Sequence, residues 1–375
     1  MPPTIKPRVP QILLFGSGAV GAIYVYILQK AGCQVTTVCR SNYTAVLESG
    51  LHISSAIFGE QVVRPHKVVR TVDEAVSSLS TSSSNAISDT QGEYFDFVIV
   101  CSKAFPPSPG GESAAASSAA PTTADLISPA VTPSLTTIAL IQNGIGIEEE
   151  YSARFPSNPL LSCVVYLPVT QTKPGCIEMG PVELLEIGPY ISASTPPSVA
   201  PSTPEEMQPA ETLANLVTAG GGTALAYPRI QPRRWAKMLI NATWNPMCAL
   251  SLSSDVEVMA ASEVATGYVR ACMSEVVSLA AAVLGDGEGV TERDADVALS
   301  RAVERVGQGN GRGIEPSMLA DVRNRRRIEV EAILGNAVRL ARDRGVVVTR
   351  LEGLYVLAKA LDENLARVAA ATARC

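Results

Sequence analysis

The pattern GSGAVG at residues 16–21 constrains this chain more than any other feature, because of its surroundings. It follows a short apolar run at residues 9–15 that suits a buried strand, and it precedes AIYVYILQKAG, which has helical length. Residues 34–38 then form a second strand-like segment. Glycines spaced GxGxxG between a strand and a helix are typical of a dinucleotide-binding βαβ unit, and the alternative is an ordinary glycine-rich turn.

The rest of the chain predicts two domains. Two further buried strands are predicted at residues 95–101 and 136–141. Strands that alternate with helices indicate a mostly parallel sheet. Beyond about residue 228, strand signals disappear and long helical patterns take over, as in residues 261–284 and 322–340. We therefore predict an α/β Rossmann-type domain over residues 1–228, followed by an all-α domain over residues 229–375.

Three low-complexity segments interrupt the first domain, at about residues 77–91, 106–133 and 192–209. They are rich in Ser, Pro or Ala and show no usable period, so we interpret them as surface insertions or disordered loops. In the second domain, residues 285–313 are interpreted as a loop-rich interruption between helices.

Composition excludes several classes of function. Only two of the 375 residues are histidines, His52 and His66, which argues against His-rich metal sites and a Ser-His-Asp triad. We therefore expect no metal and a proton donor other than histidine. The net charge of −6 argues against a general nucleic-acid binder.

The eight cysteines form no CxxC pair and are interpreted as free thiols in a reducing compartment. The chain shows neither the apolar core of a signal peptide nor a long uninterrupted apolar run. We expect a cytoplasmic protein without a membrane span, with mitochondrial import left open by the sequence.

The glycine loop suggests how a dinucleotide would bind. The loop comprises Gly16, Ser17, Gly18, Ala19, Val20 and Gly21. Its glycines permit a tight turn, close approach of a pyrophosphate and close packing of the helix, whose N-terminus favours anions. The second strand ends at Arg40, where an NAD site usually has an acid; a guanidinium there favours the 2′-phosphate of NADPH, and the alternative is a solvated arginine.

Two other predicted strands end in polar residues. Lys103 follows the strand at residues 95–101, and Asn143 follows the strand at residues 136–141. Ligands bind beyond the carboxyl ends of such strands, so both side chains are candidates for cofactor binding. The alternatives are an ordinary loop lysine and a turn-forming Asn-Gly pair.

The segment RRWAKMLINATWNPM carries Lys237, Asn241 and Asn245 at a spacing of four residues. On one continuous helix they would share a face within an arc of about 80°. The apolar residues between them indicate a buried helix, where such polar groups need partners. The alternative is a polar stripe that faces solvent.

Farther along, Ser317 is predicted at a helix N-cap. Glu329 lies at the border of the apolar stripe of the next helical pattern, and periodicity does not separate it from Glu331. The arginine-rich residues 323–327, which lie between Ser317 and Glu329, are interpreted as a solvated face.

Together these motifs resemble the ketopantoate reductase (2-dehydropantoate 2-reductase) family. The resemblance runs through GSGAVG, the strand-end arginine, CSKAF, QNGIG, WAKMLINATWNPMCAL and PSMLADVRNRRRIEVEAILGNAV, in that order along most of the chain. It implies a Rossmann domain followed by a helical domain, and reduction of 2-dehydropantoate to pantoate with NADPH, within pantothenate and coenzyme A biosynthesis.

The resemblance also implies roles for single residues. Lys237 matches the family's proton donor and Glu329 its glutamate near the reacting centre, while Asn241, Asn245 and Ser317 match its substrate-binding residues. Lys103 and Asn143 match cofactor-side residues. The alternatives are a reductase of another 2-oxo acid or ketone, and a dinucleotide-binding regulator without turnover. A homodimer through the helical domain is compatible with the sequence.

Overall fold

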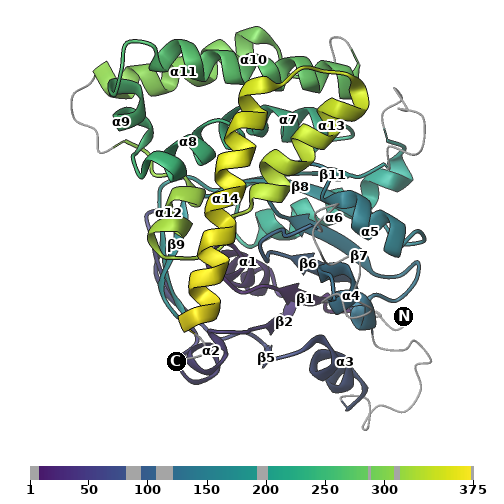
Figure 1. The fold of residues 1–375 in the computed structure, drawn as a ribbon. Coiled ribbons are helices and arrows are strands. Elements are labelled where there is room, and N and C mark those ends of the chain that lie inside the picture. Colours follow the sequence, from purple (N-terminus) through teal and green to yellow (C-terminus); the bar gives the residue numbers. More distant parts are fainter. Residues whose placement is uncertain are drawn as a thin grey trace. The chain divides into compact units, whose positions relative to one another are not determined.

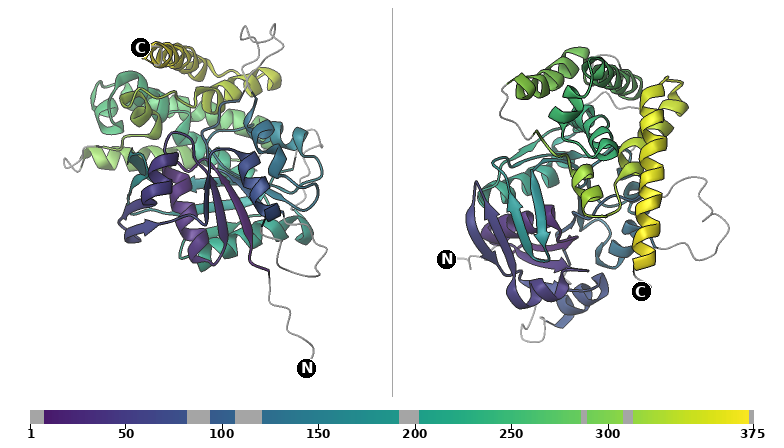
Figure 2. Two further views of the ribbon diagram at one scale, coloured as in Figure 1. Left: turned by 90° about the horizontal axis from the view of Figure 1, so that it is seen from below. Right: turned by 60° about the vertical axis from the view of Figure 1, so that its left-hand side comes forward.

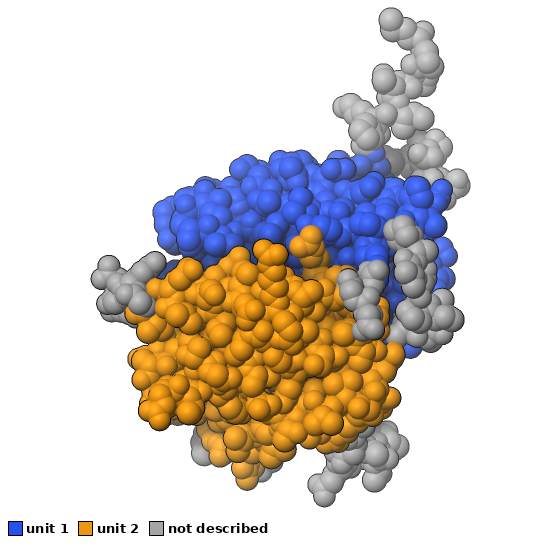
Figure 3. Space-filling view, turned by 90° about the horizontal axis from the view of Figure 1, so that it is seen from above, with its two compact units in different colours: residues 1–103, 117–142, 148–230 blue, residues 104–116, 143–147, 231–375 orange. Residues whose placement is uncertain are grey.

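The structure is a computed structural model that describes residues 8–81, 94–106, 121–191, 202–285, 289–307 and 313–372. The chain forms two compact units, coloured separately in Figure 3. Unit 1 comprises residues 1–103, 117–142 and 148–230. Unit 2 comprises residues 231–375 together with two short pieces of the preceding chain, 104–116 and 143–147.

Unit 1 is built on an eight-stranded sheet in the order β12-β11-β8-β7-β6-β1-β2-β5. Six neighbouring strands of this sheet run parallel, namely β8, β7, β6, β1, β2 and β5. Strand β11 is antiparallel to β8 and parallel to β12. The bounds are β1 Gln11–Phe15, β2 Gln34–Val38, β5 Lys67–Val69, β6 Phe97–Val100, β7 Thr137–Ile141, β8 Leu160–Tyr166, β11 Leu184–Pro189 and β12 Ala224–Ala226.

Helices cover both faces of this sheet because its strands alternate their apolar side chains between two cores. Ile12 and Leu14 pack with α1 and α6, whereas Leu13 and Phe15 pack with α3, α4 and α5. The bounds are α1 Ala19–Lys30, α3 Val72–Thr81, α4 Thr123–Ile127, α5 Glu148–Arg154 and α6 Pro204–Ala219, with a short 3₁₀ turn, η3, at Ser128–Ala130.

A second, four-stranded sheet in the order β4-β3-β10-β9 belongs to the same unit. Helix α2 (Tyr43–Ser49) connects β2 of the first sheet to β3 of this one. The strands of the second sheet are β3 Leu51–Ser55, β4 Gly59–Val63, β9 Val169–Lys173 and β10 Cys176–Met179. The described strands all lie in the purple-to-teal part of the chain in Figures 1 and 2, so the predicted order of a mostly parallel α/β domain and then a helical domain is confirmed.

The regular secondary structure described for unit 2 consists of helices. Its bounds are α7 Gln231–Asn241, α8 Trp244–Ser251, α9 Asp255–Ala260, α10 Ala265–Leu284, α11 Glu292–Gly307, α12 Ser317–Arg323, α13 Asn336–Arg344 and α14 Thr349–Thr372, with a π-helical turn, η4, at Glu331–Gly335. Only α10, among the described helices, is long and apolar enough to span a membrane by length and composition. Its buried side chains, such as Met273 and Val276, belong to the core of this unit.

Helices occupy parts of the segments that we expected to be irregular, which is a correction. Helix α4 lies within residues 106–133, α6 begins within residues 192–209, and α3 extends to Thr81. Thr122 and Thr203 begin α4 and α6 with reciprocal capping boxes, which explains helix formation in Pro- and Ser-rich sequence. Residues 82–93, 107–120 and 192–201 lie outside the described part of the chain.

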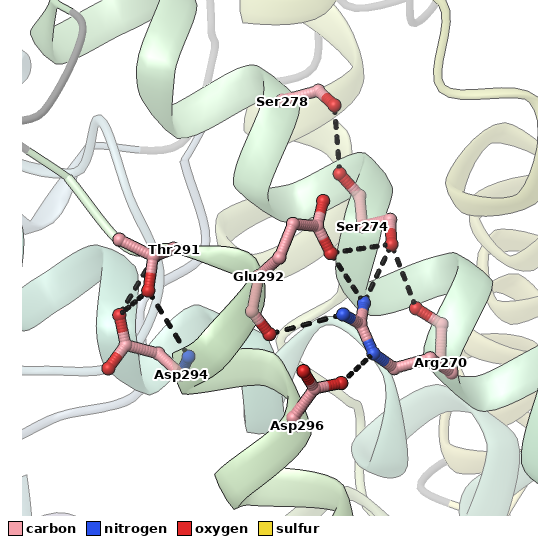
Figure 4. A network of polar contacts seen from close by, with 7 residues as sticks. All are labelled: Arg270, Ser274, Ser278, Thr291, Glu292, Asp294 and Asp296. Carbon is pink, nitrogen blue, oxygen red and sulfur yellow. Dashed lines mark hydrogen bonds and ion pairs between the residues drawn. The ribbon is translucent and has the colours of Figure 1, made fainter.

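A further correction concerns residues 285–313, which we expected to be loop-rich. They contain the 16-residue helix α11. Thr291 and Asp294 cap its start, with the Thr291 amide and hydroxyl 2.8 and 2.7 Å from the carboxylate (Figure 4). Arg270 of α10 binds Glu292 and Asp296 of α11, each at 2.6 Å, so the two helices are held together by ion pairs as well as by their core.

Candidate active site

The glycine loop in unit 1 has the geometry of a phosphate cradle. A Cβ atom on Gly16 would lie 2.5 Å from the Ser102 nitrogen, and one on Gly21 would lie 2.3 Å from the Gly16 oxygen, so neither position accepts a side chain. Gly18 is exposed with nothing within 4 Å of its Cβ position. No side chain caps the N-terminus of α1 at this glycine, so its backbone N–H groups are available to an anion.

Arg40 lies next to this loop in the fold. Asn42 is buried and donates a hydrogen bond to the Ser17 carbonyl at 2.7 Å, which ties the turn after β2 to the glycine loop. The Cys39 sulfur lies 2.7 Å from the Ser17 hydroxyl, and burial raises the pKa of this thiol. The Arg40 side chain is exposed. The strand end therefore offers a guanidinium to a ligand at the loop.

Lys103 and Asn143 are assigned to different units, although both follow strands of the same sheet. Lys103 is half-buried and ends the first segment of unit 1, where Gln142 donates to the neighbouring Ser102 carbonyl at 2.7 Å. Asn143 begins the segment 143–147 that belongs to the helical unit. Its side-chain contacts are accordingly with Lys237 and Glu329 of that unit.

The Asn143 amide connects Lys237 with Glu329. The Lys237 ammonium donates to Asn143 Oδ1 at 2.8 Å, and Asn143 Nδ2 lies 3.5 Å from Glu329 Oε2. An ammonium only donates and a carboxylate only accepts, so the two partners determine the orientation of the amide. The Ala104 amide donates to the other Glu329 oxygen at 2.9 Å. A lysine, an amide and a buried carboxylate thus form one chain of contacts.

Asn241 and Asn245 do not share one helix, which corrects the sequence prediction. Helix α7 ends at Asn241 and α8 begins at Trp244. Pro246 explains the break, because a proline ring clashes with the carbonyl four residues earlier and has no N–H to donate. The two asparagines nevertheless meet: Asn245 Nδ2 donates to Asn241 Oδ1 at 3.2 Å, and both side chains are buried.

Ser317 is the first residue of α12 and not its N-cap, which is Pro316. The Asn245 side-chain oxygen takes over the capping role, since it accepts from the Met318 amide at 3.2 Å and from the Ser317 hydroxyl at 3.4 Å. Ser317 is exposed. The three predicted substrate-binding residues therefore form a connected group.

Glu329 and Glu331 lie in different surroundings. Glu331 is buried in a separate network in which it accepts from Arg339 at 2.9 Å, from Tyr355 at 3.0 Å and from Lys359 at 3.2 Å. Glu329, by contrast, contacts Asn143. The structure thus brings Glu329 and not Glu331 to the lysine and asparagine.

Residues 323–327 are exposed, as predicted. Their arginines are partly paired: Arg326 binds Asp321 at 3.0 Å, and Arg327 binds the fully buried Asp362 at 2.5 Å. Sequence reasoning missed Asp362, which also accepts from the Ile328 amide at 3.0 Å and so fixes the backbone just before Glu329.

Neither histidine lies in this group, and both are exposed in unit 1. Within the described ranges, no cluster of three or more His, Cys, Asp or Glu residues could hold a metal ion. The described site offers the chemistry of a lysine, three side-chain amides, a hydroxyl and a carboxylate.

Comparison with known proteins identifies the family. Residues 12–190 match the family described as ketopantoate reductase PanE/ApbA, and residues 229–362 match its C-terminal domain. The chain therefore belongs to the ketopantoate reductase family, which comprises oxidoreductases that act on CH–OH groups.

Among curated relatives, the chain is 27% identical to an uncharacterized protein of Saccharomyces cerevisiae, covering 92% of each chain. It is 26% identical to the meiotically up-regulated gene 72 protein of Schizosaccharomyces pombe, covering 96% of this chain but only 58% of that protein. It is 23% identical to a 2-dehydropantoate 2-reductase of Nostoc sp., covering 93% of this chain and 94% of the relative.

Solved structures agree with this assignment. The 2-dehydropantoate 2-reductase of Methylococcus capsulatus is 30% identical, with a TM-score of 0.71 over 95% of this chain and 97% of the other. D-Mandelate dehydrogenase, solved with NADH and anilino(oxo)acetate, shares the fold at 17% identity, with a TM-score of 0.71 over 95% of this chain and 99% of the other.

Proposed function

We propose that this protein catalyses the NADPH-dependent reduction of 2-dehydropantoate (ketopantoate) to pantoate, a step of pantothenate and coenzyme A biosynthesis. The observation that carries the proposal is the contact of Lys237 with Asn143, 2.8 Å apart and connected to the buried Glu329. A buried carboxylate near an ammonium favours its charged form. The likeness to the Methylococcus capsulatus 2-dehydropantoate 2-reductase supports the choice of substrate.

The described residues fit a nicotinamide dinucleotide. The open space at Gly18 and the uncapped N-terminus of α1 suit a pyrophosphate. The exposed Arg40 at the end of β2 suits a 2′-phosphate, and no acid follows that strand to bind a ribose 2′-hydroxyl. We therefore assign the glycine loop and Arg40 to NADPH, and the resemblance to the family adds Lys103 and Asn143 to this set.

In the proposed reaction a nicotinamide dinucleotide held by the glycine loop and Arg40 would supply the hydride for the ketone carbon. Lys237 donates a hydrogen bond to the ketone oxygen, stabilises the negative charge that develops there, and gives it a proton. Asn143 holds the ammonium in place. Asn241 offers an N–H donor to an acceptor oxygen of a 2-oxo acid, and Ser317 would turn its O–H from Asn245, 3.4 Å away, to a second one. Solvent then returns the proton to the lysine.

The direct test is the decrease in absorbance at 340 nm when the purified protein is mixed with NADPH and ketopantoate, repeated with NADH. We expect turnover with NADPH and a much smaller kcat/KM with NADH. Absence of turnover with either cofactor would contradict the proposed reaction. Turnover with NADH alone would contradict the assignment of Arg40.

A second candidate is the reduction of another 2-oxo acid or ketone in a secondary pathway. The observation that favours it is a neighbour of the same fold, D-mandelate dehydrogenase, which was solved with anilino(oxo)acetate, an oxo acid derivative. Steady-state kinetics over a panel of 2-oxo acids discriminates the two. NADPH binding without turnover of any panel member would indicate a regulator.

Two properties of the proposed enzyme concern its setting. We propose that it acts in the cytoplasm, with fluorescence microscopy of a tagged chain as the test. We also propose a homodimer, which light scattering of the purified protein checks directly.

A further inference from the structure

The backbone that carries Asn143 is held from the helical unit at three points. Arg234 of α7 donates to the Gly144 carbonyl at 2.8 Å. The Ile145 amide donates to the Ala332 carbonyl at 3.0 Å. The Ile145 carbonyl accepts from Asn336 Nδ2 at 2.6 Å, which is the shortest of the three contacts. The position of the Asn143 side chain therefore depends on residues far away in the sequence.

The π-helical turn η4 makes the second of these contacts available. The Asn336 amide donates to the Glu331 carbonyl, five residues earlier, where an α-helix would direct it to Ala332. The Ala332 carbonyl is thereby released from that bond and accepts from Ile145 instead. Gly144 passes so close to it that a Cβ atom would lie 2.3 Å from the Ala332 oxygen.

The side chain of Asn336 is itself fixed. Arg339 donates to Asn336 Oδ1 at 2.6 Å, and its other nitrogen binds Glu331 at 2.9 Å. Because a guanidinium only donates, the amide oxygen of Asn336 must face Arg339 and its nitrogen must face the Ile145 carbonyl. A buried carboxylate, an arginine and an amide thus determine where the backbone after Asn143 lies.

We propose that Asn336 is a positioning residue that holds the segment 143–147 so that Asn143 presents its oxygen to the Lys237 ammonium. This inference rests on the proposed function, in which Lys237 is the proton donor. It assigns to Asn336 an effect on kcat that is transmitted through Asn143. Asn336 itself contacts neither of the two candidate catalytic residues in the described contacts.

The test uses Asn336→Asp in the full chain. The substitution keeps the size of the side chain and the acceptor for Arg339, but it replaces the donor to Ile145 with an oxygen. Loss of geometry at a reacting centre commonly lowers rates by one to two orders of magnitude, so we expect kcat to fall about tenfold or more with a smaller change in KM. Arg342→Ala on the same helix, at an exposed side chain, is the control and should leave kcat unchanged.

A double-mutant cycle with Asn143→Ala separates positioning from a general structural effect. If Asn336 acts through Asn143, Asn336→Asp should lower kcat less than about twofold in the Asn143→Ala background, since coupled residues are non-additive. An equal loss in both backgrounds, or an unchanged kcat in the single variant, would overturn the proposal. If Asn336→Asp does not fold, Asn336→Ala takes its place in the same cycle.

Amide hydrogen exchange gives a readout that does not require turnover. Exchange in peptides that cover residues 143–147 should be about tenfold faster in Asn336→Asp than in the wild type and the Arg342→Ala control. Unchanged exchange would overturn the positioning role even if the protein is active. A wild type with slow exchange here but no activity on any 2-oxo acid would instead refute the proposed function alone.

Discussion

The side-chain nitrogen of Asn245 donates a hydrogen bond to the side-chain oxygen of Asn241 at 3.2 Å, across the break between α7 and α8. The oxygen of Asn245 is also in use, because it accepts from the Met318 amide. Both ends of the Asn245 amide are therefore satisfied within the protein. Asn241, with its oxygen held in this way, directs its nitrogen elsewhere, and we assign that nitrogen to the substrate.

Substitutions of these two asparagines should have related effects. Asn241→Ala removes a donor to the substrate and should raise KM about tenfold, the usual worth of one hydrogen bond to a charged group. Asn245→Ala should raise KM by releasing Asn241 and should also lower the melting temperature, since α12 loses its cap. Kinetics of the double variant check the coupling: a KM increase equal to the product of the two single effects would contradict it.

Lys237→Ala should lower kcat by about two to four orders of magnitude, the range for loss of a general acid. The physical reason is that an alanine side chain has no proton to deliver to the ketone oxygen. Lys173→Ala removes an exposed lysine of β9 and is the matched control. Stopped-flow single-turnover rates at 340 nm provide the measurement, and near-normal turnover of Lys237→Ala would show that the lysine is not the acid.

Arg40→Ala should weaken NADPH binding by about ten- to a hundredfold, because a charge-assisted hydrogen bond to a phosphate contributes about 1.5–3 kcal/mol. NADH has no 2′-phosphate, so its affinity should stay the same. Isothermal titration calorimetry with both cofactors tests this, with Arg64→Ala as an exposed control in the same unit. Equal losses for the two cofactors would place the arginine elsewhere than at the 2′-phosphate.

Two glycine-to-alanine substitutions should change stability in opposite directions. Gly144 has a φ of +103° and approaches the Ala332 carbonyl, so Gly144→Ala should destabilise the protein by at least about 2 kcal/mol and displace Asn143. Gly353 lies within α14 with nothing near its Cβ position, so Gly353→Ala should stabilise by about 0.5–1 kcal/mol. Urea unfolding curves check both signs.

The capping box of α11 predicts a dependence of stability on pH. Hydrogen bonds from the Thr291 hydroxyl and amide lower the pKa of Asp294 below 3.8. A carboxyl with a lowered folded-state pKa stabilises the protein above its unfolded value, and this contribution disappears as the pH falls through the folded value. Thr291→Ala should therefore cost about 1 kcal/mol at pH 7 and less below about pH 4. A cost that is constant from pH 7 to pH 3 would contradict this.

Local sequence rules were sufficient for the glycine loop and for the strand and helix on either side of it, β1 and α1, because each depends on neighbours within one turn or strand. The segments that we interpret as irregular also contain sequence patterns that predict the start of a helix. Thr122, Thr203 and Thr291 each precede an acid three residues later, the pattern of a capping box. For Thr122 and Thr203, the proline and serine content of the surrounding sequence outweighed that pattern in our prediction.

Other parts of the site carry no local signal. Glu329 and Glu331 are two residues apart, and periodicity assumes one regular helix, whereas Glu329 precedes the helix and a π turn begins at Glu331. The assignment of Asn143 to the helical unit depends on contacts across more than 90 residues of sequence. The partners of such a residue follow from tertiary packing and not from its neighbours.

Because residues 143–147 belong to the helical unit, no single cut divides the gene into two self-sufficient halves. A fragment that starts at residue 231 would lack Ile145, which is buried in its core, together with the amide that holds Lys237. Recombination of domains between family members at one crossover would thus pair a helical half with a foreign version of this pentapeptide. Evolution of substrate preference in such chimaeras requires that the five residues and the helices change together.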